Sequence, residues 1–162
     1  MSSKIFVMKK IIFSTVLFLS LSLVHAQNYE YQITEGTVPG QEYAVSFGTN
    51  IIGANEDFVK YNWQKFVKKQ GGTTYLVKSD FGNFEFESEH VSFPALGGEE
   101  VTLHSRFTPN DDETGVELTI WIENGDGTYY SIKESKNSGD EIKKWLRSFN
   151  KKVMKINRSQ RW

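Results

Sequence analysis

Two stretches of this sequence alternate polar and apolar side chains, and the polar positions carry groups that could bind a ligand. This period of two is typical of β-strands, whose successive side chains point to opposite faces of a sheet. On the first strand Thr102, His104, Arg106 and Thr108 share one face, and on the second Glu117, Thr119, Trp121 and Glu123 do. If the intervening apolar residues face a core, these eight lie on an open face. An arginine that stacks on an indole can bind a planar or anionic group, so we hypothesise a binding site of Trp121, Arg106 and His104.

Catalysis receives less support from the same residues. His90 and His104 are the only histidines after residue 26, and neither lies in a local pattern of an activated nucleophile. Cysteine is absent, which excludes disulfides, thiolate nucleophiles and cysteine-ligated metals. We therefore assign no catalytic residue and no cofactor. A small hydrolase-like enzyme that uses His104 with nearby acids is the alternative.

Two acidic loops supply oxygen atoms of the kind that calcium prefers. They are Asp111-Asp112-Glu113 and the segment from Glu123 to Gly127, and neither has EF-hand spacing. The second loop is expected at the same end of the sheet as Glu99 and Glu100. Solvated hairpin turns are the favoured interpretation, so no metal site is predicted, and calcium binding stays an open alternative.

Residues 1–26 have the pattern of a secretory signal peptide. Lys4, Lys9 and Lys10 precede an uncharged run from Ile11 to Val24, and Val24-His25-Ala26 precedes the expected cleavage before Gln27. The run is short for a membrane anchor, which is the alternative. Translation could start at Met1 or at Met8. We predict a periplasmic or secreted protein.

Charge is unevenly distributed along the predicted mature chain, which has 16 basic and 20 acidic side chains and a formal net charge of −4. From Asp80 to Asp126 there are twelve acids and one base, Arg106, whereas from Lys133 onward there are ten bases and three acids. Acidic strands and a basic C-terminal helix are predicted. Nucleic acid is not expected as a partner of an exported protein.

The elements that position these residues follow from periodicity and turn signals. Residues 27–40 form an N-terminal segment with one candidate edge strand, and residues 41–156 form a single domain. A strand over 41–47 and a loop over 48–54 lead to a helix that Asn55 caps and Gly71-Gly72 end. Four strands are expected over 73–79, 83–91, 100–108 and 115–124, and residues 128–132 are a candidate for a fifth. A Ser138-to-Glu141 capping box opens a helix to residue 156, and residues 157–162 form a basic tail.

This order predicts a two-layer α+β domain, with two amphipathic helices on one face of an antiparallel meander sheet. The order resembles the β-α-β4-α arrangement of TATA-box-binding-protein-like folds, with a helix-grip fold as the alternative. The chain also resembles a family of small, uncharacterised exported bacterial proteins with a signal peptide before such a domain. The resemblance rests on residues 59–66, residues 116–122 and the lysine-rich last helix, and it implies no catalytic residues.

From these observations we expect a non-enzymatic binding or interaction domain of the cell envelope. It would use its open sheet face or its basic C-terminal helix to contact an envelope protein or a small ligand. A purely assembling structural subunit is a further alternative. The sequence leaves the ligand, the pathway and the oligomeric state open.

Overall fold

The computed structural model describes residues 31–38, 41–78, 84–110, 114–131 and 136–160. The unit Tyr31–Trp162 is compact by itself. Two of the predicted features, the signal peptide of residues 1–26 and the acidic loop 111–113, lie outside the described residues.

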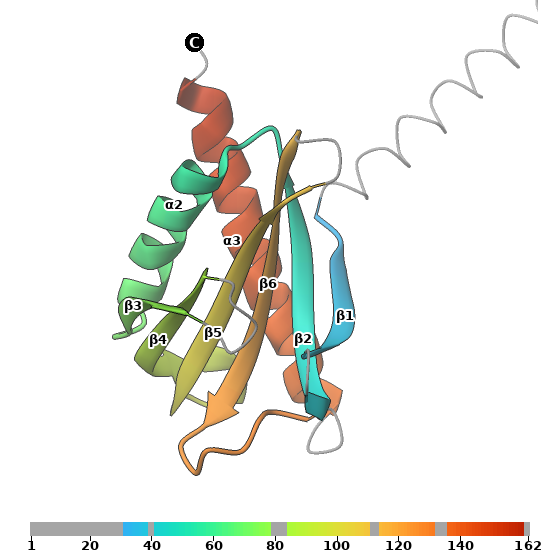
Figure 1. The fold of residues 1–162 in the computed structure, drawn as a ribbon, viewed down its shortest axis with the longest axis vertical. Coiled ribbons are helices and arrows are strands. Elements are labelled where there is room, and N and C mark those ends of the chain that lie inside the picture. The colour runs from blue at the N-terminus through green and yellow to red at the C-terminus, as the bar shows by residue number, and fades with distance from the viewer. Residues whose placement is uncertain (1–30, 39–40, 79–83, 111–113, 132–135, 161–162) are drawn as a thin grey trace, which may run out of the picture. The chain divides into compact units, whose positions relative to one another are not determined.

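Six antiparallel strands form one sheet in the order β1-β2-β6-β5-β4-β3, and two helices cover one of its faces (Figure 1). The strands are β1 (Ile33–Val38), β2 (Gln41–Ile52), β3 (Thr73–Lys78), β4 (Phe84–Phe93), β5 (Glu99–Pro109) and β6 (Gly115–Asn124). The helices are α2 (Glu56–Lys68) and α3 (Lys136–Gln160), with a short 3-10 turn, η1 (Pro94–Leu96), before β5. The predicted two-layer α+β class is therefore confirmed.

Helix α2 begins where its sequence predicts. The Asn55 side-chain oxygen accepts a hydrogen bond from the backbone N–H of Phe58 at 2.9 Å, which satisfies one of the free donors of the first turn. Val59, Trp63 and Val67 are buried at spacings of four residues, so one stripe of the helix packs on the sheet.

Helix α3 differs from the prediction at both ends. It begins at Lys136, so Ser138 lies inside the first turn and the predicted capping box does not open the helix. It continues to Gln160, so residues 157–160 of the predicted tail are helical. Near the start of α3, Lys143 forms an ion pair with Glu35 of β1, and this partner raises the pKa of the lysine. The pair ties the helix to the edge of the sheet.

The core between the layers is centred on Trp63. Its ring contacts Phe66, Trp145 and Phe149 at centroid separations of 6.1, 5.6 and 4.8 Å. The Trp63 Nε1–H donates to Ser105 Oγ at 2.8 Å, and that hydroxyl donates to the Phe86 carbonyl at 3.3 Å. The predicted placement of two amphipathic helices on one face of the sheet is confirmed, with Phe66 and Trp145 only partly buried.

Two predictions about strands are wrong. Residues 48–52, predicted as a loop, continue β2 and pair with β6, with Gly48 opposite Thr119 and Asn50 opposite Glu117. The predicted fifth strand at 128–132 is reduced to a single bridge between Glu123 and Tyr129. In both places contacts with distant segments decide the backbone conformation.

A membrane-spanning segment was not found among the helices that the structure describes.

Candidate functional site

The face of the sheet opposite the helices carries the predicted binding residues. Ser105 bonds to Trp63 on the helix side, so His104 and Arg106 must point to the other face. We call this the open face. His104 pairs with Trp121 across β5 and β6 and with Glu87 across β4 and β5. The predicted strand alternation is therefore confirmed.

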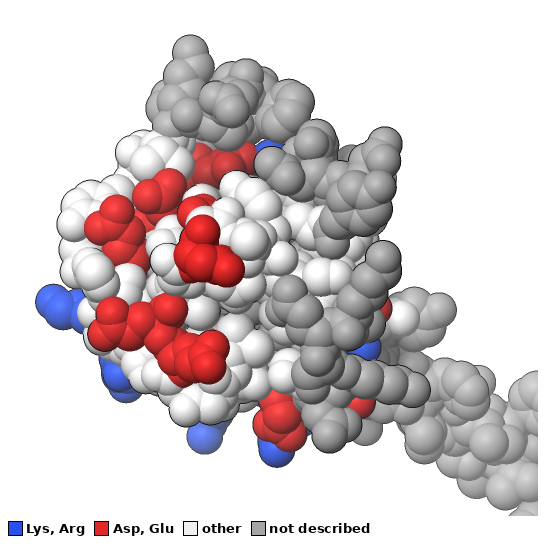
Figure 2. All heavy atoms as spheres, turned by 90° about the horizontal axis from the view of Figure 1, so that it is seen from below, with Lys and Arg blue, Asp and Glu red and all other residues white. Residues whose placement is uncertain are grey.

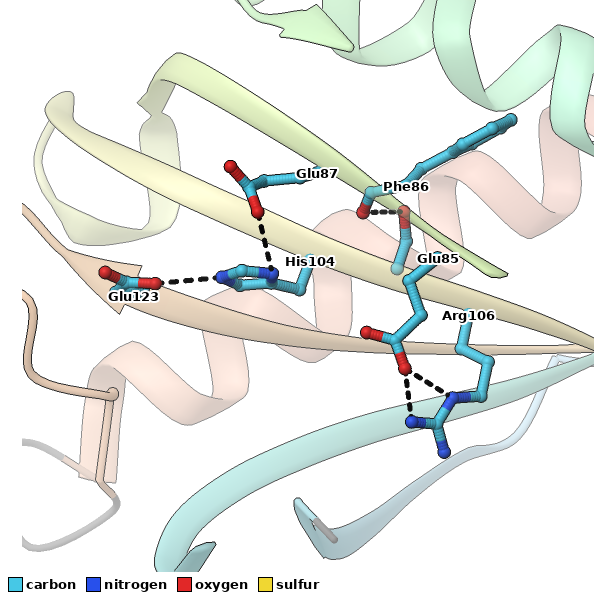
Figure 3. Close-up of polar contacts among 7 residues, drawn as sticks. Glu85, Phe86, Glu87, His104, Arg106 and Glu123 are labelled. Atoms are coloured by element: carbon cyan, nitrogen blue, oxygen red, sulfur yellow. Dashed lines mark hydrogen bonds and ion pairs between the residues drawn. The ribbon is translucent and has the colours of Figure 1, made fainter. Parts of the chain in front are cut away.

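His104 lies between two carboxylates, as Figure 3 shows. Its Nε2 is 3.0 Å from Glu123 Oε2 and its Nδ1 is 4.0 Å from Glu87 Oε2. The ring is parallel to that of Trp121 within 3°, at a centroid separation of 5.5 Å. About a tenth of the His104 side chain is exposed, against 31% of each glutamate. The histidine thus hydrogen-bonds to one glutamate and lies close to a second, and both carboxylates remain partly exposed.

Arg106 forms the second polar unit of the open face. Its Nε donates to Glu85 Oε1 at 2.9 Å, and its Nη2 contacts the same oxygen. Glu85 is 6% exposed, and a buried carboxylate without a partner is costly. The guanidinium carbon also lies 5.5 Å from the centre of the Trp121 ring. Arg106 is therefore already used inside the protein, where it neutralises Glu85.

Trp121 lies beside Arg106 as predicted, but its predicted exposure to solvent is wrong. It is 5% exposed and forms a small cluster with Val38 and Ala44, against which Tyr129 packs. The chain after β6 folds back to make this cover, because the Tyr130 N–H donates to the Ile122 carbonyl at 2.9 Å and the Val45 N–H donates to the Tyr130 carbonyl at 3.2 Å. Trp121 is thus a support beneath the polar residues and not an anchor for a partner.

Sequence reasoning missed Glu85, Glu87 and Tyr129 as members of this site. The alternation of Glu85, Glu87 and Glu89 in β4 was a usable signal, because a strand beside β5 must place all three on one face. Tyr129 had no such signal. Its position depends on the chain reversal at 124–128, where the Asp126 carboxylate accepts bonds from the backbone and hydroxyl of Thr128 at 2.9 and 2.6 Å. These bonds lower the pKa of Asp126.

An open pocket of about 380 Å³ lies at the end of the sheet where the acidic loop was expected to meet Glu100. Glu89, His90, Glu100 and Gly125 contribute to its lining. His90 adopts a positive φ of 56° in the bulge of β4, and its Nδ1 is 3.4 Å from Glu100 Oε2. No group of three or more potential metal ligands occurs in the described ranges, so the calcium alternative gains no support from them.

The described contacts of His104 are to carboxylates and aromatic rings. A hydrolase would need the imidazole beside a nucleophile, and no hydroxyl bonds to it in the part of the chain that the structure describes. The arrangement places the imidazole between two carboxylates and beside an indole ring.

Comparisons of the chain with protein-family models, with curated proteins and with solved structures found no match.

Proposed function

We propose that this protein is a non-enzymatic binding domain of the cell envelope, and that its open face binds a cationic surface of a partner protein. The observation that carries the proposal is the charge of this face. Besides Glu85, the strands β4, β5 and β6 place five carboxylates on it: Glu87, Glu89, Glu100, Glu117 and Glu123. The arginine on the same face is neutralised by Glu85.

A concentration of like charge on one face supports recognition of the opposite charge. Such a face steers an oppositely charged partner toward itself and repels partners of its own sign. Figure 2 views the molecule from below, toward one end of the sheet. Acidic side chains lie across this view, and lysines and arginines lie mainly at its left and lower rim. The partner that best fits this face is a basic protein surface.

The polar units of the open face are ordered before any partner arrives. Glu123 is held by His104, which is itself fixed by its stack on Trp121. Side chains that are already ordered lose less entropy on binding. This order supports a binding role for the carboxylates of the open face, with Trp121 and His104 as positioning residues.

Export belongs to the same proposal and rests on the charged start, the apolar run and the Val24-His25-Ala26 segment of the sequence. Mass spectrometry of the mature N-terminus tests it. We expect a chain that begins at Gln27. A membrane-bound product that retains residues 11–24 would contradict export with cleavage.

The binding proposal is tested with hexalysine as a cationic probe. Isothermal titration at about 20 mM salt, where exposed charges are weakly screened, should give binding to the mature chain from Gln27, which contains the compact unit Tyr31–Trp162. The variant Glu87→Gln/Glu123→Gln should bind about fivefold more weakly, since each partly exposed ion pair contributes about 0.2–1 kcal/mol.

A matched control keeps the same change of net charge away from the open face. Asp140 and Glu141 lie on α3, with 72% and 56% of their side chains exposed. The variant Asp140→Asn/Glu141→Gln should bind hexalysine like the wild type. Equal losses in both variants would show that only net charge matters, and the proposed site would be wrong.

A further inference from the structure

The outer side of the helix layer has the opposite charge to the open face. We call it the basic helix surface, and its exposed lysines are Lys65, Lys68, Lys69, Lys144, Lys151, Lys152 and Lys155. On α2, residues Tyr61 and Lys65 lie opposite the buried Trp63, and the ammonium of Lys65 is 4.1 Å from the Tyr61 ring centre. Helix α3 contributes the lysines that alternate with its buried stripe.

The ammonium of Lys152 on α3 lies 5.9 Å from the ring centre of Phe66 on α2, and Lys69 at the C-terminal end of α2 is a close neighbour. Partial desolvation and the neighbouring charge of Lys69 lower the pKa of Lys152. Among the described ion pairs of the molecule, none includes either lysine. Two cations held close together favour an anionic partner, because a carboxylate between them relieves their repulsion.

Two oppositely charged surfaces therefore lie on opposite sides of one two-layer domain. The helices cover one face of the sheet (Figure 1). The register of the strands places the carboxylates on the other. We propose that the cationic partner of the open face is a second copy of this chain, which presents its basic helix surface. This inference rests on the function proposed above and names the partner of that site.

Exposed aromatic rings give each surface an apolar contact as well. Tyr61 on the basic helix surface is 55% exposed. Tyr75 of β3 is 49% exposed and is paired with Glu87, so it lies on the open face. Tyrosine is enriched among the residues that dominate binding energies at protein interfaces. An aromatic residue next to the charges provides the dispersion contacts that charge complementarity lacks.

The geometry makes the contact heterologous, because each copy would use a different surface from its neighbour. Such a contact leaves one open face and one basic helix surface unoccupied at the ends of any assembly, so copies add head to tail. A lipid surface is the competing partner for the lysines. It would leave the open face without a role, whereas a second copy satisfies both surfaces.

Sedimentation of the mature wild-type chain tests the assembly. At about 20 mM salt its average mass should rise with concentration, and it should return to that of a monomer at about 300 mM, where charges are screened. A wild-type chain that stays monomeric in low salt would overturn the inference of self-assembly. If hexalysine still binds this monomeric chain, the proposed binding function of the open face stands without self-assembly.

Two blocked variants distinguish this contact from a symmetric one. Glu87→Gln/Glu123→Gln weakens the open face, and Lys69→Gln/Lys152→Gln weakens the basic helix surface. Each alone should be largely monomeric, whereas an equal mixture should form dimers of about twice the monomer mass and nothing larger, because one intact surface of each kind remains. Larger assemblies of either variant alone, or a mixture without dimers, would contradict the head-to-tail contact.

A vesicle experiment covers the competing partner. Wild-type chain is mixed with vesicles of phosphatidylglycerol and phosphatidylcholine, and with phosphatidylcholine alone. We expect Lys69→Gln/Lys152→Gln to bind the anionic vesicles like the wild type. We also expect this vesicle binding to be no stronger than self-assembly. Strong binding to the anionic vesicles by a chain that stays monomeric in solution would replace the second copy with a lipid surface.

Discussion

The two sides of the sheet each bury a tryptophan, but they hold it in different ways. On the helix side, Trp63 is enclosed by aromatic rings and makes one hydrogen bond, to Ser105. On the open face, Trp121 lies beside His104, whose partner Glu123 is partly exposed, and beside Arg106, which pairs with the buried Glu85. The helix side encloses its tryptophan in the main apolar core. On the open face, a small apolar cluster around Trp121 supports the charged side chains.

The largest effect is expected on the helix side. Replacing Trp63 by Ala should lower the free energy of unfolding by about 3–5 kcal/mol, because it opens a large cavity and leaves Ser105 with one partner fewer. Chemical denaturation measures the loss. A cooperative variant that loses less than about 1 kcal/mol would show that Trp63 is not the centre of the core.

Trp121 should be the next most costly position. Because it is covered by Val38, Ala44 and Tyr129, Trp121→Ser should cost about 2–4 kcal/mol, less than a change in the main core. Unfolding curves for the two tryptophan variants, recorded under the same conditions, make the comparison. A Trp121→Ser variant as stable as the wild type would restore the exposed tryptophan that its sequence pattern predicts.

The ion pair of Arg106 and Glu85 should show strong coupling. Arg106→Met alone leaves the buried Glu85 without its cation and should cost about 1–3 kcal/mol, whereas Arg106→Met with Glu85→Gln should cost less than the sum of the single changes. A double-mutant cycle in denaturant measures this. Additive single effects would mean that Arg106 does not neutralise Glu85.

The smallest effect is expected at the chain reversal that covers Trp121. The pKa of Asp126 is lowered below its ordinary value of 3.8 because Thr128 donates to the carboxylate. A lowered folded-state pKa adds stability above the unfolded value, and this is lost as pH falls through the folded value. The difference in melting temperature between wild type and Asp126→Ala should therefore be constant near neutral pH and shrink below pH of about 4. A difference that grows in acid would contradict the assigned bonds.

The two sides also differ in how well the sequence predicts them. Periodicity indicates the buried stripe of α2, the Asn55 cap and the facing of Ser105 correctly, because local pattern and burial agree there. It gives the direction of Trp121 but not its burial, since Val38 and Tyr129 come from distant segments. Gly48 and Asn50 interrupt the alternation of polar and apolar residues in β2. A Cβ atom at Gly48 would lie 2.7 Å from the Thr34 hydroxyl. That glycine leaves room for the Thr34 side chain across the β1–β2 pair, and no local rule predicts it.

The most direct test of the central claim is a map of amide chemical shifts on the mature chain as hexalysine is added, at a chain concentration low enough to keep it monomeric. We expect the largest changes in β4, β5 and β6 around Glu87, His104 and Glu123, and little change in the amides of α2 and α3. Changes concentrated on the helices, or spread evenly over the molecule, would contradict a cation-binding open face.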